Sequence, residues 1–189
     1  MENHDHHDDC YYTMKVGDML PEMTLTAYDP KKDETVKIAT ADYQEKGKKK
    51  GKWMVLVFYP ADFTFICPTE LEEMAGLYAE FVKLGAEVLS VSCDTAFVHK
   101  AWHDASATIR KIKFPMIADP VREICKAYGT LIEGEGLSYR ATFIIDPNGI
   151  IKWFEIHDNS IGRSSKEILR KVKAAKLRDS ALRQGGIRS

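Results

Sequence analysis

The sequence has no apolar run long enough to cross a membrane. Its longest apolar stretches, residues 53–60 and 141–145, have the length of strands, whereas a membrane-spanning helix needs about 20 apolar residues. The first ten residues lack both the positive charge and the apolar stretch of a secretory signal. We therefore expect a cytoplasmic protein that has no membrane partner.

Charge of one sign is not in excess either. The chain has 27 Lys and Arg against 28 Asp and Glu, which gives a formal net charge of -1. This balance gives no global electrostatic reason to expect a nucleic acid or an anionic surface as the partner. We expect the partner to be a small molecule or another protein.

Cysteine is sparse, and no two cysteines form a C-x-x-C pair. The four cysteines, Cys10, Cys67, Cys93 and Cys125, are widely spaced. This spacing argues against a zinc module and against a thioredoxin-type dithiol. In a reducing compartment, scattered cysteines remain thiols, and most of them pack as small apolar residues.

The length and composition indicate one domain with a sizeable core. The chain has 189 residues, of which 44% are hydrophobic. We expect a polar N-terminal segment over 1–13, a folded domain over 14–176 and a polar tail over 177–189. The histidines and aspartates of the first segment have metal-ligand chemistry, but a short acidic stretch of this kind is more simply a solvated segment. We predict no metal site there.

Hydrophobic periodicity predicts a strand, a helix and further strands in alternation. Segments 23–27 and 36–38 form a hairpin, and the unbroken apolar run over 53–59 is typical of a strand buried on both faces. Apolar residues spaced by three and four then predict an amphipathic helix that ends at Gly85. The residues of its apolar face are Leu71, Met74, Tyr78, Phe81 and Val82.

The second half of the chain continues this order. We expect strands over 86–91 and 114–118, helices over 95–108 and 121–128, a hairpin of 139–146 with 150–156, and a final helix. The hairpin turns at Asp-Pro-Asn-Gly, which supplies the backbone angles of a tight turn. The fold class is therefore α/β, a thioredoxin-like sandwich with a mixed central sheet and helices on both faces.

One cysteine has a position with chemical meaning. Cys67 falls between the buried strand and the long helix, and Pro68 marks the first helical turn because its missing N–H costs nothing there. The positive end of the helix then favours the thiolate form of Cys67 over the thiol. A buried cap residue is the alternative for an arbitrary cysteine.

The surroundings of Cys67 overturn that alternative. The segment P-A-D-F-T-F-I-C-P-T-E over 60–70, preceded by V-L-V-F-Y, resembles the active-site signature of the peroxiredoxins, P-x-x-x-T-x-x-C. Segments 99–103, 118–120, 141–147 and 161–164 also resemble this family, and within it the peroxidases of bacterial alkyl hydroperoxide reductase. The resemblance covers about 14–176. It implies an enzyme, a thiol-dependent peroxidase that reduces hydrogen peroxide and alkyl hydroperoxides without metal or organic cofactor.

The resemblance also implies roles for individual residues. Cys67 is the nucleophile that becomes a sulfenic acid, and the Thr64 hydroxyl hydrogen-bonds its thiolate and the peroxide. Pro60 shields the sulfur from water, and Arg140 holds the thiolate ionised and polarises the O–O bond. Two further residues, Glu70 and Arg163, match those that orient this arginine in the family.

The sequence departs from the family in its resolving cysteine. Two-cysteine members carry a G-E-V-C-P segment near the C-terminus, and residues 177–189 contain no cysteine. We predict that Cys93, at the end of a strand, and Cys125, in a helix, are buried and inert, and that Cys10 lies in an untethered segment. An external thiol would then resolve Cys67, supplied by thioredoxin, a flavin disulfide reductase or a small thiol.

Two other functions compete with the peroxidase. A disulfide reductase of the same fold is disfavoured because no C-x-x-C is present. A catalytically impaired assembly or holdase protein is suggested by the missing resolving cysteine, but Pro60, Thr64, Cys67 and Arg140 are all retained. The resemblance further implies a homodimer formed through the strand over 150–156, and assembly into a decamer is possible in the family.

Overall fold

The computed structural model describes residues 14–46 and 51–185. Its centre is a mixed seven-stranded sheet in the order β2-β1-β5-β4-β3-β8-β9. The strands are β1 (Thr24–Asp29), β2 (Glu34–Ala39), β3 (Trp53–Phe58), β4 (Ala86–Ser92), β5 (Met116–Ala118), β8 (Arg140–Ile145) and β9 (Ile151–His157). A separate small hairpin consists of β6 (Leu131–Ile132) and β7 (Leu137–Ser138).

Four α-helices complete the described part of the chain, and they confirm the predicted α/β sandwich. They are α1 (Cys67–Lys83), α2 (Ala96–Ala105), α3 (Glu123–Ala127) and α4 (Ser165–Gly185). Two short 3-10 helices span Thr40–Tyr43 and Ile109–Lys111. No helix among the described residues is long and apolar enough to span a membrane.

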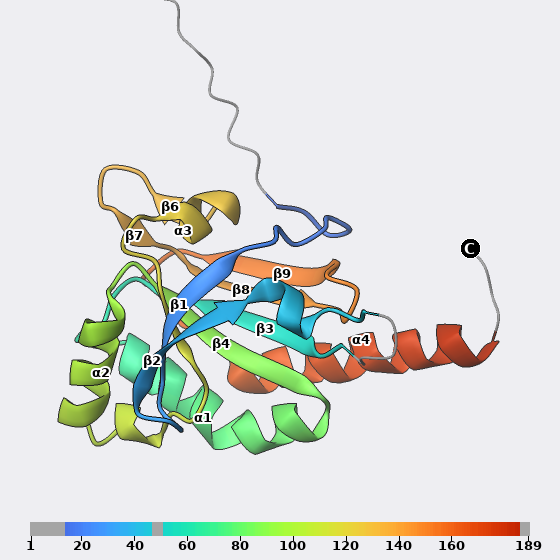
Figure 1. Cartoon of the computed structure of the whole chain (residues 1–189), viewed down its shortest axis with the longest axis horizontal. Coiled ribbons are helices and arrows are strands. Elements are labelled where there is room, and N and C mark those ends of the chain that lie inside the picture. The colour runs from blue at the N-terminus through green and yellow to red at the C-terminus, as the bar shows by residue number, and fades with distance from the viewer. Residues whose placement is uncertain (1–13, 47–50, 186–189) are drawn as a thin grey trace, which may run out of the picture.

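The two faces of the sheet are covered unequally (Figure 1). Helices α1, α2 and α4 pack on one face, around a core that includes Val55, Val57 and Phe81. The opposite core includes Phe58 and Phe143, and it is covered by the short α3 and by the described residues that precede β1. Alternate residues of β3 enter opposite cores, because successive side chains of a strand point to opposite faces.

The parallel β3-α1-β4-α2-β5 unit arises from the predicted alternation. Strand β3 pairs in parallel with β4 and antiparallel with β8, and all six β3 residues are buried, as the unbroken apolar run predicts. Gly85 has φ of 69° directly after α1, a conformation that glycine adopts without steric cost. The C-terminal ends of β3 and β4 therefore lie side by side, and so do the loops that follow these strands.

Several predicted elements needed correction. The helix expected over 95–108 is Ala96–Ala105, because Ser106 is extended. The helix expected over 121–128 is Glu123–Ala127, because Arg122 has φ of 62°, outside the helical region. Val82, expected on the apolar face of α1, is 49% exposed. The β6–β7 hairpin was missed, and α4 continues beyond Lys176 to Gly185.

Candidate active site

Cys67 lies at the start of α1, the helix that follows β3 in the chain. It is the first residue of α1 and is fully buried, and Pro68 stands in the first turn as predicted. The loop from Tyr59 to Ile66 connects it to β3, and Pro60 in this loop is buried. The sulfur is therefore held at the positive end of a 17-residue helix.

Arg140 reaches this sulfur from the neighbouring strand. It is the first residue of β8, which runs antiparallel to β3 with Ala141 opposite Phe58. Because β8 begins where β3 ends, the side chain of Arg140 lies beside the start of α1. Its Nη1 donates a hydrogen bond to the Cys67 sulfur at 3.3 Å. The guanidinium thus places a positive charge within hydrogen-bonding distance of the sulfur.

Glu70 anchors Arg140 from one turn further along α1. Its Oε2 accepts a hydrogen bond from Arg140 Nη1 at 2.5 Å, and its Oε1 accepts from the backbone N–H of Arg163 at 2.7 Å. Burial alone would raise the pKa of Glu70, but the charges and hydrogen bonds of Arg163 and Arg140 outweigh it and hold the pKa below its ordinary value. Glu70 is therefore the anion between two guanidiniums.

Arg163 ties this cluster to the sheet. Its Nη1 donates to the carbonyl oxygens of Phe58 and Ala141, each at 2.7 Å, and its Nε donates to Glu70 Oε1 at 3.1 Å. The side chain thus joins the end of β3, the start of β8 and α1. The buried guanidiniums of Arg140 and Arg163 each pair with Glu70, which offsets the cost of burying each charge alone.

The structure does not join Thr64 to the sulfur. Its hydroxyl donates to the carbonyl oxygen of Ala61 at 3.0 Å, and no hydrogen bond connects it to Cys67 among the described residues. The neighbouring Phe63 has φ of 56°, so the backbone turns sharply here. The role that the resemblance implies for Thr64 stays a prediction, and it requires the hydroxyl to leave Ala61.

A buried polar group that the sequence did not indicate supports this loop. Asp62 accepts a hydrogen bond from the Tyr59 hydroxyl at 2.7 Å and lies 2.8 Å from Nδ1 of His99, on α2. Nε2 of His99 faces the carbonyl oxygen of Ile117 at 3.0 Å, and a carbonyl can only accept, so Nε2 carries a proton. The pKa of Asp62 is raised above its ordinary value, because the effect of burial is larger than the opposite effect of His99.

Spacing alone could not have joined these residues. Asp62 and His99 are 37 positions apart, and they meet because the loops after β3 and β4 share one edge of the sheet. The segment around His99 belonged to the family resemblance, which gave it no role. Three apolar residues of the loop before Cys67 are exposed, namely Phe63 at 58%, Phe65 at 99% and Ile66 at 41%.

Cys93 and Cys125 lie away from Cys67. Cys93 and Cys125 contact each other, with their sulfurs 3.7 Å apart, and both belong to the core on the α3 side of the sheet, whereas Cys67 belongs to the opposite core. Cys125 is buried as predicted, but Cys93 is only half-buried because it lies in the turn just past β4. Cys10 falls outside the described residues.

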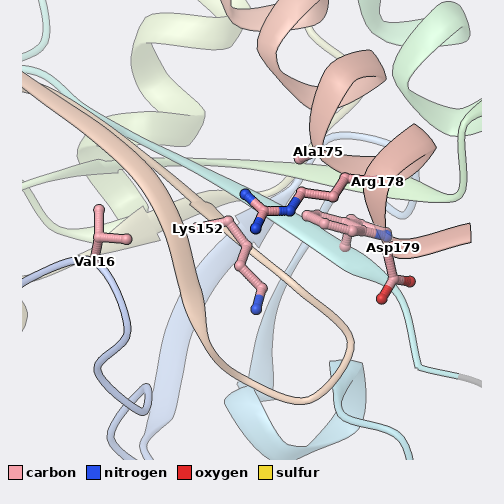
Figure 2. Close-up of a pocket in the computed structure, with 6 residues that line it drawn as sticks. Val16, Lys152, Ala175, Arg178 and Asp179 are labelled. Carbon is pink, nitrogen blue, oxygen red and sulfur yellow. The ribbon is translucent and has the colours of Figure 1, made fainter. Parts of the chain in front are cut away.

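A hollow of about 350 Å³ lies at the other end of β3 (Figure 2). Trp53, the first residue of β3, lines it together with Lys152 of β9 and Arg178 of α4. Since Cys67 follows the opposite end of the same strand, this hollow is separate from the Cys67 cluster.

Comparisons with known proteins decide the family. The family model described as "AhpC/TSA family" matches residues 16–154. The alkyl hydroperoxide reductase C of Staphylococcus epidermidis is 48% identical over 158 residues, which cover 84% of this chain and 80% of that protein. The chain belongs to the AhpC/TSA family.

Solved structures agree with this AhpC/TSA assignment. AhpC of Enterococcus faecalis has a TM-score of 0.81 and 41% identity, covering 92% of this chain and 97% of its own. The reduced 2-Cys peroxiredoxin of Plasmodium vivax has a TM-score of 0.81 and 30% identity, covering 88% and 84%. The predicted peroxiredoxin resemblance and thioredoxin-like fold are confirmed, and the chain is a thiol-dependent peroxidase of this family.

Proposed function

We propose that Cys67 is the nucleophile with which this peroxidase reduces hydrogen peroxide and alkyl hydroperoxides. The observation that carries the proposal is the 3.3 Å hydrogen bond from Arg140 to the Cys67 sulfur, at the start of α1. The thiolate attacks one peroxide oxygen, so that an S–O bond forms and the O–O bond breaks. The leaving oxygen takes a proton and departs as water or an alcohol, and Cys67 becomes a sulfenic acid.

Arg140 has two tasks in this reaction. In the resting enzyme its guanidinium stabilises the thiolate, and during attack it donates to the oxygen that gains negative charge. Glu70 and Arg163 are positioning residues, because their bonds to Arg140 and to the strand carbonyls fix where the guanidinium points. A fixed donor needs no rearrangement when the charge develops.

Thr64 and Pro60 complete the site in this proposal. The Thr64 hydroxyl turns from Ala61 towards the thiolate and the bound peroxide, while Pro60 excludes water from the sulfur. Because Cys67 is fully buried, the loop that holds the exposed Phe65 must shift to admit a peroxide. Apolar side chains on this loop would contact the organic part of an alkyl hydroperoxide.

We infer that the sulfenic acid is resolved by a thiol outside this chain. Cys93 and Cys125 contact each other on the other side of the sheet, which supports their exclusion as partners of Cys67. The reductant belongs to the class of thioredoxin-like proteins, flavin disulfide reductases or small thiols. We place the enzyme in the cytoplasm, where such reductants keep thiols reduced.

We also propose a homodimer that forms through β9 and can extend to a decamer. Strand β9 is at the edge of the sheet, so its outer backbone groups are available to a second copy. Trp153 and Phe154 are half-buried, and Ile156 is 37% exposed. A paired edge with aromatic side chains is typical of a buried interface.

A single-turnover measurement tests the proposed function. Fully reduced protein is mixed with an equimolar amount of hydrogen peroxide without added thiol, and the loss of peroxide is followed. We expect rapid consumption by the natural protein and by Cys125→Ser, and no rapid phase in Cys67→Ser. A phase in Cys67→Ser that is as fast as in the natural protein would refute the assignment of the nucleophile.

A further inference from the structure

A pair of thiols lies outside the site described above. Cys93 follows β4, Cys125 lies in α3, and their sulfurs are 3.7 Å apart although 32 residues separate them in the chain. Both pack in the core under α3, whereas Cys67 packs in the core under α1. The sheet therefore stands between this pair and the nucleophile proposed above.

The two thiols are not equivalent. The sulfurs of Cys93 and Cys125 share a hydrogen bond, and this contact lowers the pKa of Cys93 despite its partial burial. The same contact with Cys93 and the burial of Cys125 raise the pKa of Cys125. Cys93 is also the more exposed of the two. This asymmetry makes Cys93 the nucleophile of the pair and Cys125 the thiol that follows.

Hydrogen bonds of the surrounding backbone hold Cys93 and Cys125 in place beside each other. The N–H of Cys125 donates to the Asp119 carboxylate at 2.8 Å, which fixes the first turns of α3 beside the end of β5. On the other side, Asp94 accepts hydrogen bonds from the Ser92 hydroxyl at 2.9 Å and from the N–H of Asp62 at 2.8 Å. Cys93 is thus fixed from the residues on both sides of it.

A disulfide is within reach of this arrangement. The sulfurs must approach from 3.7 Å to about 2.05 Å. The short α3, with five residues, contributes only Ile124 and Cys125 to the buried side chains. A helix with so few buried residues can shift at a lower cost than one that forms the main core.

We propose that Cys93 and Cys125 form a second redox site, in which a hydroperoxide oxidises the dithiol to an intramolecular disulfide. The Cys93 sulfur attacks a peroxide oxygen, an S–O bond forms, the O–O bond breaks, and the leaving oxygen departs with a proton as water or an alcohol. The Cys125 sulfur then attacks the Cys93 sulfenic acid, so that an S–S bond forms and the S–O bond breaks. The hydroxyl leaves as water with the Cys125 proton, and the two sulfurs have given two electrons to the peroxide.

The test isolates the pair from the other thiols. A Cys10→Ser/Cys67→Ser double variant retains only Cys93 and Cys125, and it is treated with increasing hydrogen peroxide, unfolded, and alkylated. We expect loss of both alkylation sites, a cross-linked Cys93–Cys125 peptide from a monomeric chain, and recovery of both thiols with dithiothreitol. Because Cys67 is absent, the result does not depend on its proposed role.

Matched variants distinguish the two thiols. In the same background, Cys125→Ser should leave a Cys93 sulfenic acid that dimedone traps, and Cys93→Ser should leave Cys125 unreactive. Two free thiols after excess peroxide, or oxidation of Cys93 to sulfinic acid with Cys125 still free, would overturn the proposal. A carboxylate oxygen of Asp119 and the sulfurs of Cys93 and Cys125 all lie within 4.8 Å of one another, so Zn²⁺ is added to a parallel sample. If peroxide forms no disulfide and Zn²⁺ protects both thiols from alkylation, the pair is a metal site, and the proposal is overturned.

Discussion

Arg140 Nη1 lies 3.3 Å from the Cys67 sulfur, although 73 residues separate the two in the chain. The same nitrogen donates to Glu70, which in turn binds Arg163. The sulfur is therefore attached to a charged cluster that includes the ends of β3 and β8.

Replacing Arg140 by lysine should slow the reaction with peroxide. The lysine keeps a positive charge, but a single ammonium does not reproduce the planar guanidinium that faces both Cys67 and Glu70. We expect the second-order rate constant of Cys67 oxidation to fall by roughly 100-fold, as when one donor to a developing oxyanion is lost. Stopped-flow measurement against Arg170→Lys, an exposed control on α4, checks this. An unchanged rate would contradict the role of Arg140.

Glu70→Gln should change how stability depends on pH. The pKa of Glu70 is lowered in the folded protein, so its carboxylate stabilises the fold above the ordinary carboxyl pKa of about 4.3. That contribution is lost as the pH falls through the lowered value. Breaking such a buried pair costs about 3–5 kcal/mol.

The measurement is the free energy of unfolding in denaturant at several pH values. The difference between the natural protein and Glu70→Gln should be largest near pH 7 and should shrink as the pH falls below about 4.3. A difference that stays constant over this range would show that Glu70 is not charged in the fold.

His99→Ala should destabilise the loop before Cys67. The imidazole is fully buried and contacts both Asp62 and the Ile117 carbonyl. Its removal leaves the buried Asp62 carboxyl with the Tyr59 hydroxyl but without its imidazole partner, at a cost of about 3 kcal/mol or more. Lys111→Ala, which removes an exposed ion pair with Glu72, should cost at most about 1 kcal/mol. Similar thermal unfolding of the two variants would contradict this account.

Ile156→Arg should weaken the proposed dimer. Ile156 lies on the edge strand β9 and is 37% exposed, so it has room for a larger side chain in the single chain. Burying an unpaired cation in an interface between copies is costly. Sedimentation velocity should show dimers or larger assemblies for the natural protein and a shift towards monomers for the variant. An unchanged distribution would place the interface elsewhere.

The sequence predicted the fold class and the central strands well because their signals are strong and local. The run over 53–59 and the periodic helix that ends at Gly85 both appear as expected. The predicted bounds of the shorter elements were wrong where backbone geometry overrides composition. Arg122 has left-handed backbone angles, so α3 begins after it, and no residue pattern in the sequence predicts that conformation.

The candidate site was predicted residue by residue only through the family resemblance. The contacts among Cys67, Glu70, Arg140 and Arg163 require β8 to lie beside β3, and that pairing is not visible in local sequence. The Asp62–His99 pair and the contact between Cys93 and Cys125 were missed for the same reason. Each joins loops or helices that meet only after the sheet has assembled.

The central claim is that the Cys67 sulfur attacks the peroxide. Its most direct test is dimedone trapping and peptide mass spectrometry of the Cys93→Ser/Cys125→Ser variant after one equivalent of hydrogen peroxide. The account predicts one sulfenic acid adduct per chain, located on Cys67. An adduct on Cys10, or no adduct although the peroxide is consumed, would contradict it.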